Sequence, residues 1–251
     1  VAGVGIGVPG PVEETGEIPC AVNLHWGRKN IEKELGDLTG LAVKAGNDAN
    51  VAALGEMWKG GGQGAKNLIL VTLGTGVGGG IIVNEKIVTG AHGAGGEIGH
   101  AFVNPAETKA CNCGNKGCLE QYASATGIAR LAKEALESET EDSVLRTVKN
   151  ISAKSVFDAY KEGDALAGKI VDKFAAYLGN ALAVFACVSD PDVFVIGGGV
   201  SKAGQVLIDA VEKYYKAHAF TASKETPIKL ATLGNDAGIY GAAKLILSKD
   251  N

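Results

Sequence analysis

The sequence predicts an α/β fold with a mainly parallel sheet, arranged in two layers with a cleft between them. Short apolar strands alternate with segments of helical periodicity along the chain, which is the pattern of strand–helix–strand units. Glycine accounts for 37 of the 251 residues, about twice its usual share. The glycines cluster in short runs between apolar segments, so they indicate tight turns and ligand-binding loops rather than low complexity.

The first part of the chain, residues 1–62, is expected to hold two strands and two helices. The predicted strands are Val1–Val8, which ends at a Pro-Gly-Pro turn, and Leu41–Ala45. The predicted helices are Ile31–Leu38, which stops at Gly40, and Val51–Trp58. The run Gly60–Gly64 is a flexible joint by composition, and it is the predicted domain boundary.

The second part, residues 63–237, is expected to continue the alternation. The predicted strands are Leu68–Leu73, Ile81–Val83, Lys86–Val88, Val193–Ile196 and Ile228–Leu233, the second and third forming a hairpin. The predicted helices are Leu119–Leu136, Ile151–Tyr160, Asp164–Val188 and Ala203–Tyr215. A closing helix within residues 238–248 is expected to pack back on the first part.

Charge and cysteine content limit the function classes. The net charge is −4 and the pI is near 5.6, which argues against a nucleic-acid or anionic-membrane surface. No signal peptide is visible. No membrane span is expected either, because Lys169, Asp172 and Lys173 interrupt the longest apolar helix. Two of the five cysteines, Cys20 and Cys187, are isolated, and Cys187 is expected to be buried in that helix. The pattern suits a reducing cytoplasm.

The stretch Gly95–Glu120 holds the strongest local signal, a set of soft metal ligands. The set is His100, Cys111, Cys113 and Cys118. Three thiolates and one imidazole make a closed tetrahedral zinc site of the structural kind. The alternative is a reduced, metal-free loop, but packing does not readily explain the tight C-x-C-x4-C spacing.

Two glycine-rich loops follow predicted strands. Leu73–Gly80 carries Thr75 at its centre, and its backbone N–H groups could approach phosphate oxygens closely. It matches neither a Walker P-loop nor a Rossmann fingerprint, and a plain tight hairpin explains it equally well. Gly197–Gly199 ends a strand and opens a helix, a geometry that suits a nucleotide but also suits close helix–strand packing.

Several polar residues stand where they could bind a sugar. Asp48 lies between a strand and a helix, so it is either the helix N-cap or a general base that accepts a hydroxyl proton. Asn47 beside it could bind a neighbouring hydroxyl. Glu97, His100 and Glu120 could bind further hydroxyls, although Glu120 could also be a surface residue at a helix start.

These motifs together resemble one protein family. The segments LGTGVGGGIIVNEKIVTGAHGAGGEIGH and CNCGNKGCLE, with PGPV, NDANVAALGEMWKG and IGGGVSKAG, resemble the ROK family of repressors, open reading frames and sugar kinases. The resemblance runs from about Val1 to the C-terminus and is greatest to bacterial glucokinases of the Gram-positive type. It implies the actin-like, hexokinase-type two-domain ATPase fold.

The resemblance also implies a role for each matching residue. Asp48 would be the catalytic base for the sugar 6-hydroxyl. The sugar-binding residues would be Asn47, Glu97, His100 and Glu120, and the structural zinc ligands would be His100, Cys111, Cys113 and Cys118. Gly74, Thr75 and Gly76 would form a phosphate loop, and Gly197, Gly198 and Gly199 an adenosine loop.

Two departures from the family pattern matter. Gly46 stands where many relatives carry Glu, so the backbone there could be looser. The family's opening strand, with its Asp-x-Gly-Gly-Thr phosphate loop, is absent from the sequence. We therefore expect several dozen further residues before Val1 in the natural protein, an open edge in the first sheet, and low or absent kinase activity in this chain alone.

The function expected from the resemblance is ATP-dependent phosphorylation of glucose, a step of glycolysis. The implied cofactors are ATP, Mg²⁺ and structural Zn²⁺, and the protein is expected to be a cytoplasmic homodimer or higher homo-oligomer without nucleic-acid or membrane partners. One alternative is a kinase for N-acetylmannosamine, N-acetylglucosamine or fructose. Another is the sensor half of a ROK repressor, although a sensor does not need the base Asp48.

Overall fold

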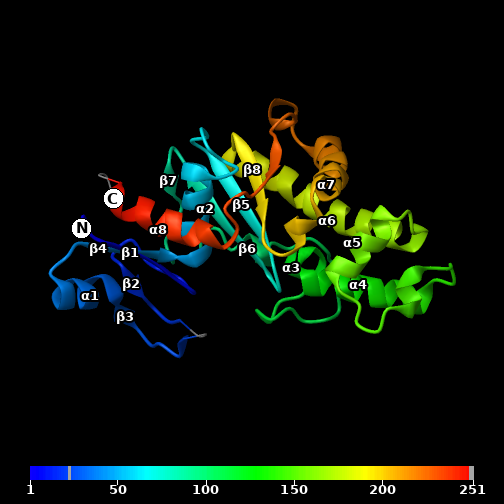
Figure 1. Cartoon of the computed structure of the whole chain (residues 1–251), viewed down its shortest axis with the longest axis horizontal. Helices are drawn as coiled ribbons and strands as arrows, with labels where there is room; N and C mark the ends of the chain where they lie inside the picture. Colours follow the sequence, from blue (N-terminus) through cyan, green and yellow to red (C-terminus); the bar gives the residue numbers. More distant parts are fainter. Residues whose placement is uncertain (22–23, 249–251) are drawn as a thin grey trace.

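A five-stranded sheet forms the centre of the molecule (Figure 1). The computed structural model describes residues 1–21 and 24–248. The strand order is β7-β6-β5-β8-β9, with β5 at Leu68–Leu73, β6 at Val77–Val83, β7 at Lys86–Ile87, β8 at Val193–Gly197 and β9 at Ile228–Leu230. β8 pairs in parallel with both β5 and β9, whereas β6 pairs antiparallel with both β5 and β7. The sheet is therefore mixed rather than mainly parallel.

Tight turns explain the antiparallel half. Asn84 and Glu85 join β6 to β7 with φ values of +52° and +65°, the left-handed geometry of a two-residue hairpin turn. Only Gly74–Gly76 separate β5 from β6, and a link that short cannot make a parallel crossover. The predicted hairpin is confirmed.

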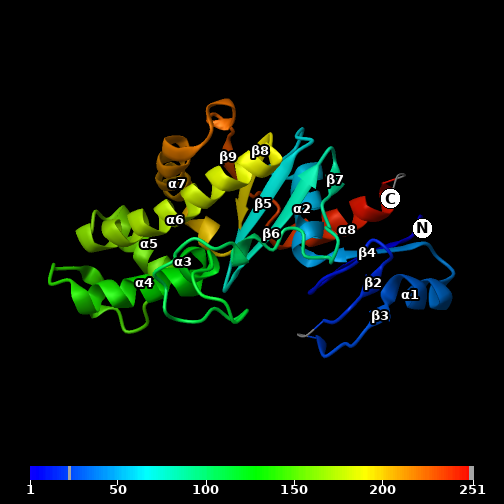
Figure 2. The ribbon, with the colours of Figure 1, turned by 180° about the vertical axis from the view of Figure 1, so that it is seen from behind.

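One face of the sheet carries the larger core. Its helices are α3 (Glu120–Ala123), α4 (Ala125–Ser138), α5 (Ala153–Lys161), α6 (Ala165–Ser189) and α7 (Gln205–His218), gathered on one side of the sheet in Figure 2. Phe174 of α6 and Phe194 of β8 are fully buried there, in edge-to-face contact with Phe157 and Tyr215 respectively. This apolar contact fixes α6 as the central helix of the layer.

The apolar composition of helix α6 and the exposure of Cys187 both differ from what the sequence predicts. By length and composition it is apolar enough to cross a membrane, yet 56% of its most apolar window is buried inside the fold, which identifies it as a core helix. Cys187 near its end is exposed, so the predicted burial of this residue is wrong. Cys187 lies on the exposed side of α6 with Val184 and Val188, a distinction that apolar composition alone does not make.

Two helices and a small parallel sheet cover the other face. Helix α2 (Asp48–Lys59) packs on the sheet, and α8 (Ala237–Leu247) lies between α2 and strand β1. A Cβ atom on Gly55 would collide with the carbonyl of Ala237, and one on Gly241 with the carbonyl of Val51. Glycine at these two positions therefore permits the close crossing of α2 and α8.

The outermost layer contains the first strands. β1 (Val4–Val8) pairs in parallel with β4 (Val43–Asn47), from Val4 opposite Val43 to Val8 opposite Asn47. Helix α1 (Ile31–Thr39) ends at Gly40, whose φ is +69°, as predicted. The short strands β2 (Glu17–Ile18) and β3 (Lys29–Asn30) form a separate pair. The predicted strand Leu41–Ala45 lies two residues further along the chain, and β4 consequently ends at Asn47.

The predicted helix Leu119–Leu136 is two helices in the structure. Ser124 between them is extended, with φ −76° and ψ 165°, and its side chain accepts a hydrogen bond from Gly127 N. Ser124 is thus the N-cap of α4. The break frees Ala125 N to donate to Gly74 O at 2.8 Å, a tertiary hydrogen bond that one continuous helix would not allow.

Candidate active site

Asn47 and Asp48 stand where β4 ends and α2 begins. Asn47 Oδ1 accepts hydrogen bonds from Ala49 N (3.0 Å) and Asn50 N (3.1 Å), and its Nδ2 donates to Gly10 O (3.1 Å). The N-cap of α2 is therefore Asn47 and not Asp48. Asp48, the first residue of the helix, is exposed, so its carboxylate can reach a substrate.

A cavity of about 290 Å³ opens beside these residues. Its walls come from the turn after β1, the residues after β2, the end of β4 and start of α2, strand β6 and the segment before His100. The lining residues are Pro9, Gly10, Pro11, Cys20, Asn47, Asp48, Ala49, Gly78, Gly79 and Glu97. Three of the five predicted sugar-site residues, Asn47, Asp48 and Glu97, thus meet in one cavity. Two carboxylates that come from different segments of the chain and line one cavity suit a ligand with several hydroxyl groups.

Glycines inside β6 allow these walls to approach. The predicted ligand loop Leu73–Gly80 is wrong in extent, because Gly78, Gly79 and Gly80 belong to the strand. A Cβ on Gly79 would press on the side chain of Ile98, and one on Gly80 on Ala53. The missing side chains let α2 and the Glu97 segment lie directly on the β6 backbone.

The remaining loop, Gly74–Gly76, is held in place by α3 and α4. Val77 N donates to Glu120 Oε2 (2.9 Å), Ala125 N to Gly74 O (2.8 Å) and Thr126 Oγ1 to Thr75 O (2.8 Å). Three anchors on so short a loop fix its shape in advance of any ligand.

The second predicted nucleotide loop lies beside the first. β5 and β8 are neighbouring parallel strands, so their carboxyl ends meet at one edge of the sheet. Gly198 has φ +83°, and a Cβ there would collide with the backbone of Leu73. Gly197 ends β8, and Gly198 and Gly199 follow it next to the point where Gly74 follows β5, a common place for ligands in α/β sheets.

The predicted metal ligands form one cluster. The ligand atoms of His100, Cys111, Cys113 and Cys118 all lie within 4.8 Å of one another. His100 Nδ1 is 3.9 Å from Cys111 Sγ, and Cys113 Sγ is 3.6 Å from Cys118 Sγ. A donor set of three sulfurs and one imidazole nitrogen at this spacing fits a tetrahedral metal ion.

Burial makes two of the three thiols, Cys111 and Cys118, weaker acids than usual. Burial, followed by hydrogen bonding with the neighbouring thiols of Cys113 and Cys111, raises the pKa of Cys118 to about 12. Burial also raises the pKa of Cys111, whereas a backbone hydrogen bond from Asn115 lowers the pKa of Cys113. A bound cation would stabilise the thiolates and release their protons.

His100 and Glu120 lie at this cluster. A single 3-10 turn joins Glu97 to His100, with His100 N donating to Glu97 O at 3.1 Å. Glu120 Oε1 is 3.7 Å from Cys111 Sγ. The metal cluster thus lies next in sequence and in space to the cavity wall that Glu97 provides.

Two residues near the site, Asn50 and Thr126, were not predicted from the sequence. Asn50 is only 3% exposed, and within the described part of the chain its Oδ1 has no hydrogen-bond partner and faces Gly96. Thr126, which anchors Thr75, was assigned to the interior of a helix. The signal that could have revealed it is Ser124 two residues earlier, because serine is a preferred N-cap.

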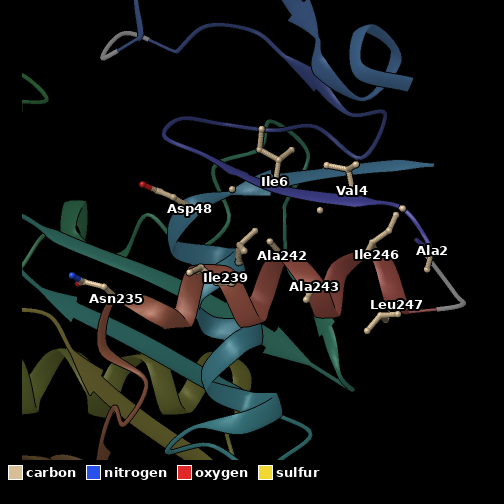
Figure 3. Close-up of a pocket in the computed structure, with 15 residues that line it drawn as sticks. Ala2, Val4, Ile6, Asp48, Asn235, Ile239, Ala242, Ala243, Ile246 and Leu247 are labelled. Atoms are coloured by element: carbon tan, nitrogen blue, oxygen red, sulfur yellow. The ribbon is translucent and has the colours of Figure 1, made fainter. Parts of the chain in front are cut away.

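A second, larger groove lies between β1 and α8 (Figure 3). It encloses about 760 Å³, with Val4 and Ile6 on one wall and Ile239 and Ala242 on the other. Asp48 and Asn235 lie together at one end of this groove. The walls are otherwise apolar, so polar chemistry here is confined to the end next to Asp48.

Comparison with known proteins identifies the family. The sequence profile of the ROK family matches residues 1–249. The chain belongs to the ROK family. The sequence is 46% identical to a glucokinase of Halalkalibacterium halodurans over 99% of this chain and 77% of the relative. It is 34% identical to an N-acetyl-D-glucosamine kinase of Histophilus somni, over 98% of this chain and 81% of the relative.

The structure agrees with this membership. A ROK family glucokinase from Streptomyces griseus, solved in complex with glucose and AMPPNP, superposes with a TM-score of 0.81 at 36% identity. The match covers 98% of this chain and 81% of that one. The expected actin-like fold of hexokinase-type sugar kinases is confirmed.

Proposed function

We propose that this ROK family chain transfers the γ-phosphoryl group of ATP to the 6-hydroxyl of glucose, giving glucose 6-phosphate and ADP. The observation that carries the proposal is the exposed Asp48 carboxylate, which shares a cavity with Glu97. The glucokinase similarity favours glucose among the hexoses.

In the proposed reaction Asp48 is the catalytic base. Its carboxylate accepts the proton of the 6-hydroxyl while that oxygen bonds to the γ-phosphorus and the bond to the β,γ-bridging oxygen breaks, so that ADP leaves. Glu97, with His100 and Glu120 from the cluster side, would hold the other sugar hydroxyls. Asn47 Oδ1 is committed to the helix cap, so we assign Asn47 to shaping the turn after β1 as well as to contact with sugar.

The glycine loops would bind the nucleotide. Within the described residues the backbone N–H groups of Thr75 and Gly76 donate to no protein acceptor, which leaves them available for phosphate oxygens. Gly197, Gly198 and Gly199 would face the adenosine. Mg²⁺ would neutralise charge on the phosphates.

We assign the metal cluster to one structural Zn²⁺. Four protein ligands fill a tetrahedral shell and leave no position for water, so the ion would order the loop rather than take part in the reaction. Thiolates in this number also suit a reducing cytoplasm. We expect a homodimer or higher homo-oligomer, which light scattering after gel filtration would test.

A kinase for N-acetylhexosamines is the second candidate, because one relative carries that activity in its name. Coupled ADP release with Mg-ATP on glucose, fructose, N-acetylglucosamine and N-acetylmannosamine separates the two. Calorimetric binding of each sugar adds a readout that does not need turnover. The proposal expects glucose to bind most tightly. Preference for an acetamido sugar would favour the second candidate, and sugar binding that survives without any Asp48-dependent turnover would favour a sensor.

A further inference from the structure

We propose that Glu120 positions the Gly74–Gly76 loop and thereby couples nucleotide binding to the state of the metal cluster. The inference rests on the proposed kinase function and deepens it at the nucleotide site. It gives Glu120 a task in addition to the sugar contact expected from the family resemblance.

The first observation is the contact between Glu120 and the loop. Glu120 Oε2 accepts a hydrogen bond from Val77 N at 2.9 Å, at the residue where the loop ends and β6 begins. A Cβ on Gly76 would collide with the same carboxylate. The side chain therefore fills the space against the loop backbone, and a charged acceptor makes the stronger kind of hydrogen bond.

The second observation is that the whole loop depends on one short segment. The other two anchors, Ala125 N to Gly74 O and Thr126 Oγ1 to Thr75 O, follow Glu120 by five and six residues. These three hydrogen bonds thus connect the loop and the first residue of β6 to one segment, residues 120–126, which covers α3 and the start of α4. With its carbonyls and the Val77 amide held from this side, the loop keeps the N–H groups of Thr75 and Gly76 available for phosphate.

The third observation is that the same segment starts at the metal cluster. Glu120 follows Cys118 by two residues, and its Oε1 is 3.7 Å from Cys111 Sγ. Leu119 between them is fully buried, and its N donates to Ala101 O at 2.9 Å, next to His100. An ion that fixes Cys111 and Cys118 would therefore also fix the backbone that carries Glu120.

The experiment compares Glu120→Gln with Glu97→Gln in the absence of sugar. Both variants remove one carboxylate from the proposed sugar site, but Glu97 does not contact the loop. The readouts are the affinity for Mg-AMPPNP by calorimetry and the hydrogen-exchange rate of the Val77 amide. Thr126→Val serves as a second loop variant should Glu120→Gln fail to fold by circular dichroism.

We expect Glu120→Gln to weaken AMPPNP binding by about tenfold or more, the value of a charged hydrogen bond, and to speed exchange at Val77. Glu97→Gln should change neither. Removal of the metal with a chelator should reproduce the faster exchange at Val77. Unchanged AMPPNP affinity and Val77 exchange in Glu120→Gln would overturn the inference and leave Glu120 a sugar ligand alone.

Failure of the proposed function would look different. Native protein that binds no AMPPNP would contradict the kinase proposal, while exchange at Val77 in the variant and in metal-stripped protein would still decide whether Glu120 holds the loop.

Discussion

At the scale of single residues, the adjacent side chains Asn47 and Asp48 have separate tasks. Asn47 satisfies two backbone N–H groups of α2 and ties the helix start to Gly10. Asp48 is therefore not required as a cap and stays exposed at the cavity. Asp48 Oδ1 accepts one further hydrogen bond, from Ala49 N at 2.8 Å, which orients the carboxylate while the capping bonds to Asn47 hold the helix start.

Replacement of Asp48 by Asn should keep the fold and most glucose affinity, because the amide preserves shape and the cap lies on Asn47. The turnover number should fall by roughly 10²–10⁴, the usual contribution of a general base. Steady-state kinetics, with circular dichroism and glucose calorimetry as controls, measure this. A near-native turnover number would exclude Asp48 as the base.

Glu107 anchors the loop between His100 and Cys111. Its carboxylate accepts hydrogen bonds from Tyr122 Oη (2.6 Å) and from the backbone N of Thr108 and Lys109 (3.0 Å each), and pairs with Arg130 at 3.0 Å. Burial alone would raise the pKa of Glu107, but the hydrogen bonds from Tyr122 and the backbone and the charge of Arg130 together lower it to about 2. The ionised form is thus the one that the fold prefers.

The pH dependence follows from that direction. A lowered pKa means that the Glu107 contribution to stability is complete above its ordinary pKa of 4.5 and is lost as the pH falls towards about 2. Glu107→Gln should therefore have a lower free energy of unfolding than native protein at neutral pH. This difference in unfolding free energy should narrow as the pH falls from 4.5 to about 2. Urea unfolding of both metal-free proteins across the range measures the gap. A gap independent of pH would contradict the assignment.

At the scale of elements, the buried carboxylate of Glu56 joins two connections. It is only 1% exposed, and it accepts hydrogen bonds from Gly61 N (2.8 Å), Thr232 N (3.1 Å) and Leu233 N (2.9 Å). Gly61 lies between α2 and β5, and the other two lie between β9 and α8. These bonds also explain why β9 ends at Leu230 and not at the predicted Leu233.

Glu56→Ala should lower the free energy of unfolding by about 3 kcal/mol or more, because three backbone N–H groups lose a charged acceptor. Chemical denaturation measures the loss, and Glu137→Ala on the exposed side of α4 is the matched control. A loss below about 1 kcal/mol would mean that water replaces the carboxylate.

The crossing of α2 and α8 gives a paired test on one helix. Gly241→Ala should destabilise the protein by about 1–3 kcal/mol through overpacking, since its Cβ would collide with the Val51 carbonyl. Gly238→Ala meets no atom within 4 Å and should be neutral or slightly stabilising. Thermal unfolding measures the change in melting temperature for both variants. Equal changes in the two variants would refute the close crossing of α2 and α8.

At the scale of the whole molecule, the metal cluster supports a wall of the cavity. We expect one zinc per chain by elemental analysis, and none in Cys113→Ser. Sugar affinity and stability should fall together in that variant, because ligand loops of this kind are ordered by their ion. Cys187→Ser, an exposed thiol outside the cluster, should retain the metal. Native protein without zinc would refute the assignment.

The division into domains at residue 62, with residues 63–237 as the second unit and 238–248 returning to the first, remains a proposal. In the structure α2 packs on the five-stranded sheet, and α8 lies between α2 and β1. Cleavage confined to Gly60–Gly64 in limited proteolysis would support the division there.

The sequence by itself determined the features that depend on neighbouring residues. The strand Leu68–Leu73, the end of α1 at Gly40 and the hairpin at Asn84-Glu85 follow from local periodicity and from backbone angles that few residues adopt. The spacing of Cys111, Cys113 and Cys118 likewise places three thiols on one short loop.

Only the tertiary structure decided how distant segments use the same residues. Asn47 rather than Asp48 caps α2 because Gly10, 37 residues away, accepts its amide. Gly79 and Gly80 lie in a strand that Ile98 and α2 contact closely. Ser124 interrupts a helical pattern at the point where Ala125 N donates a hydrogen bond to Gly74 O. In each case the local sequence is compatible with more than one conformation. A contact formed only after the chain has folded selects between them.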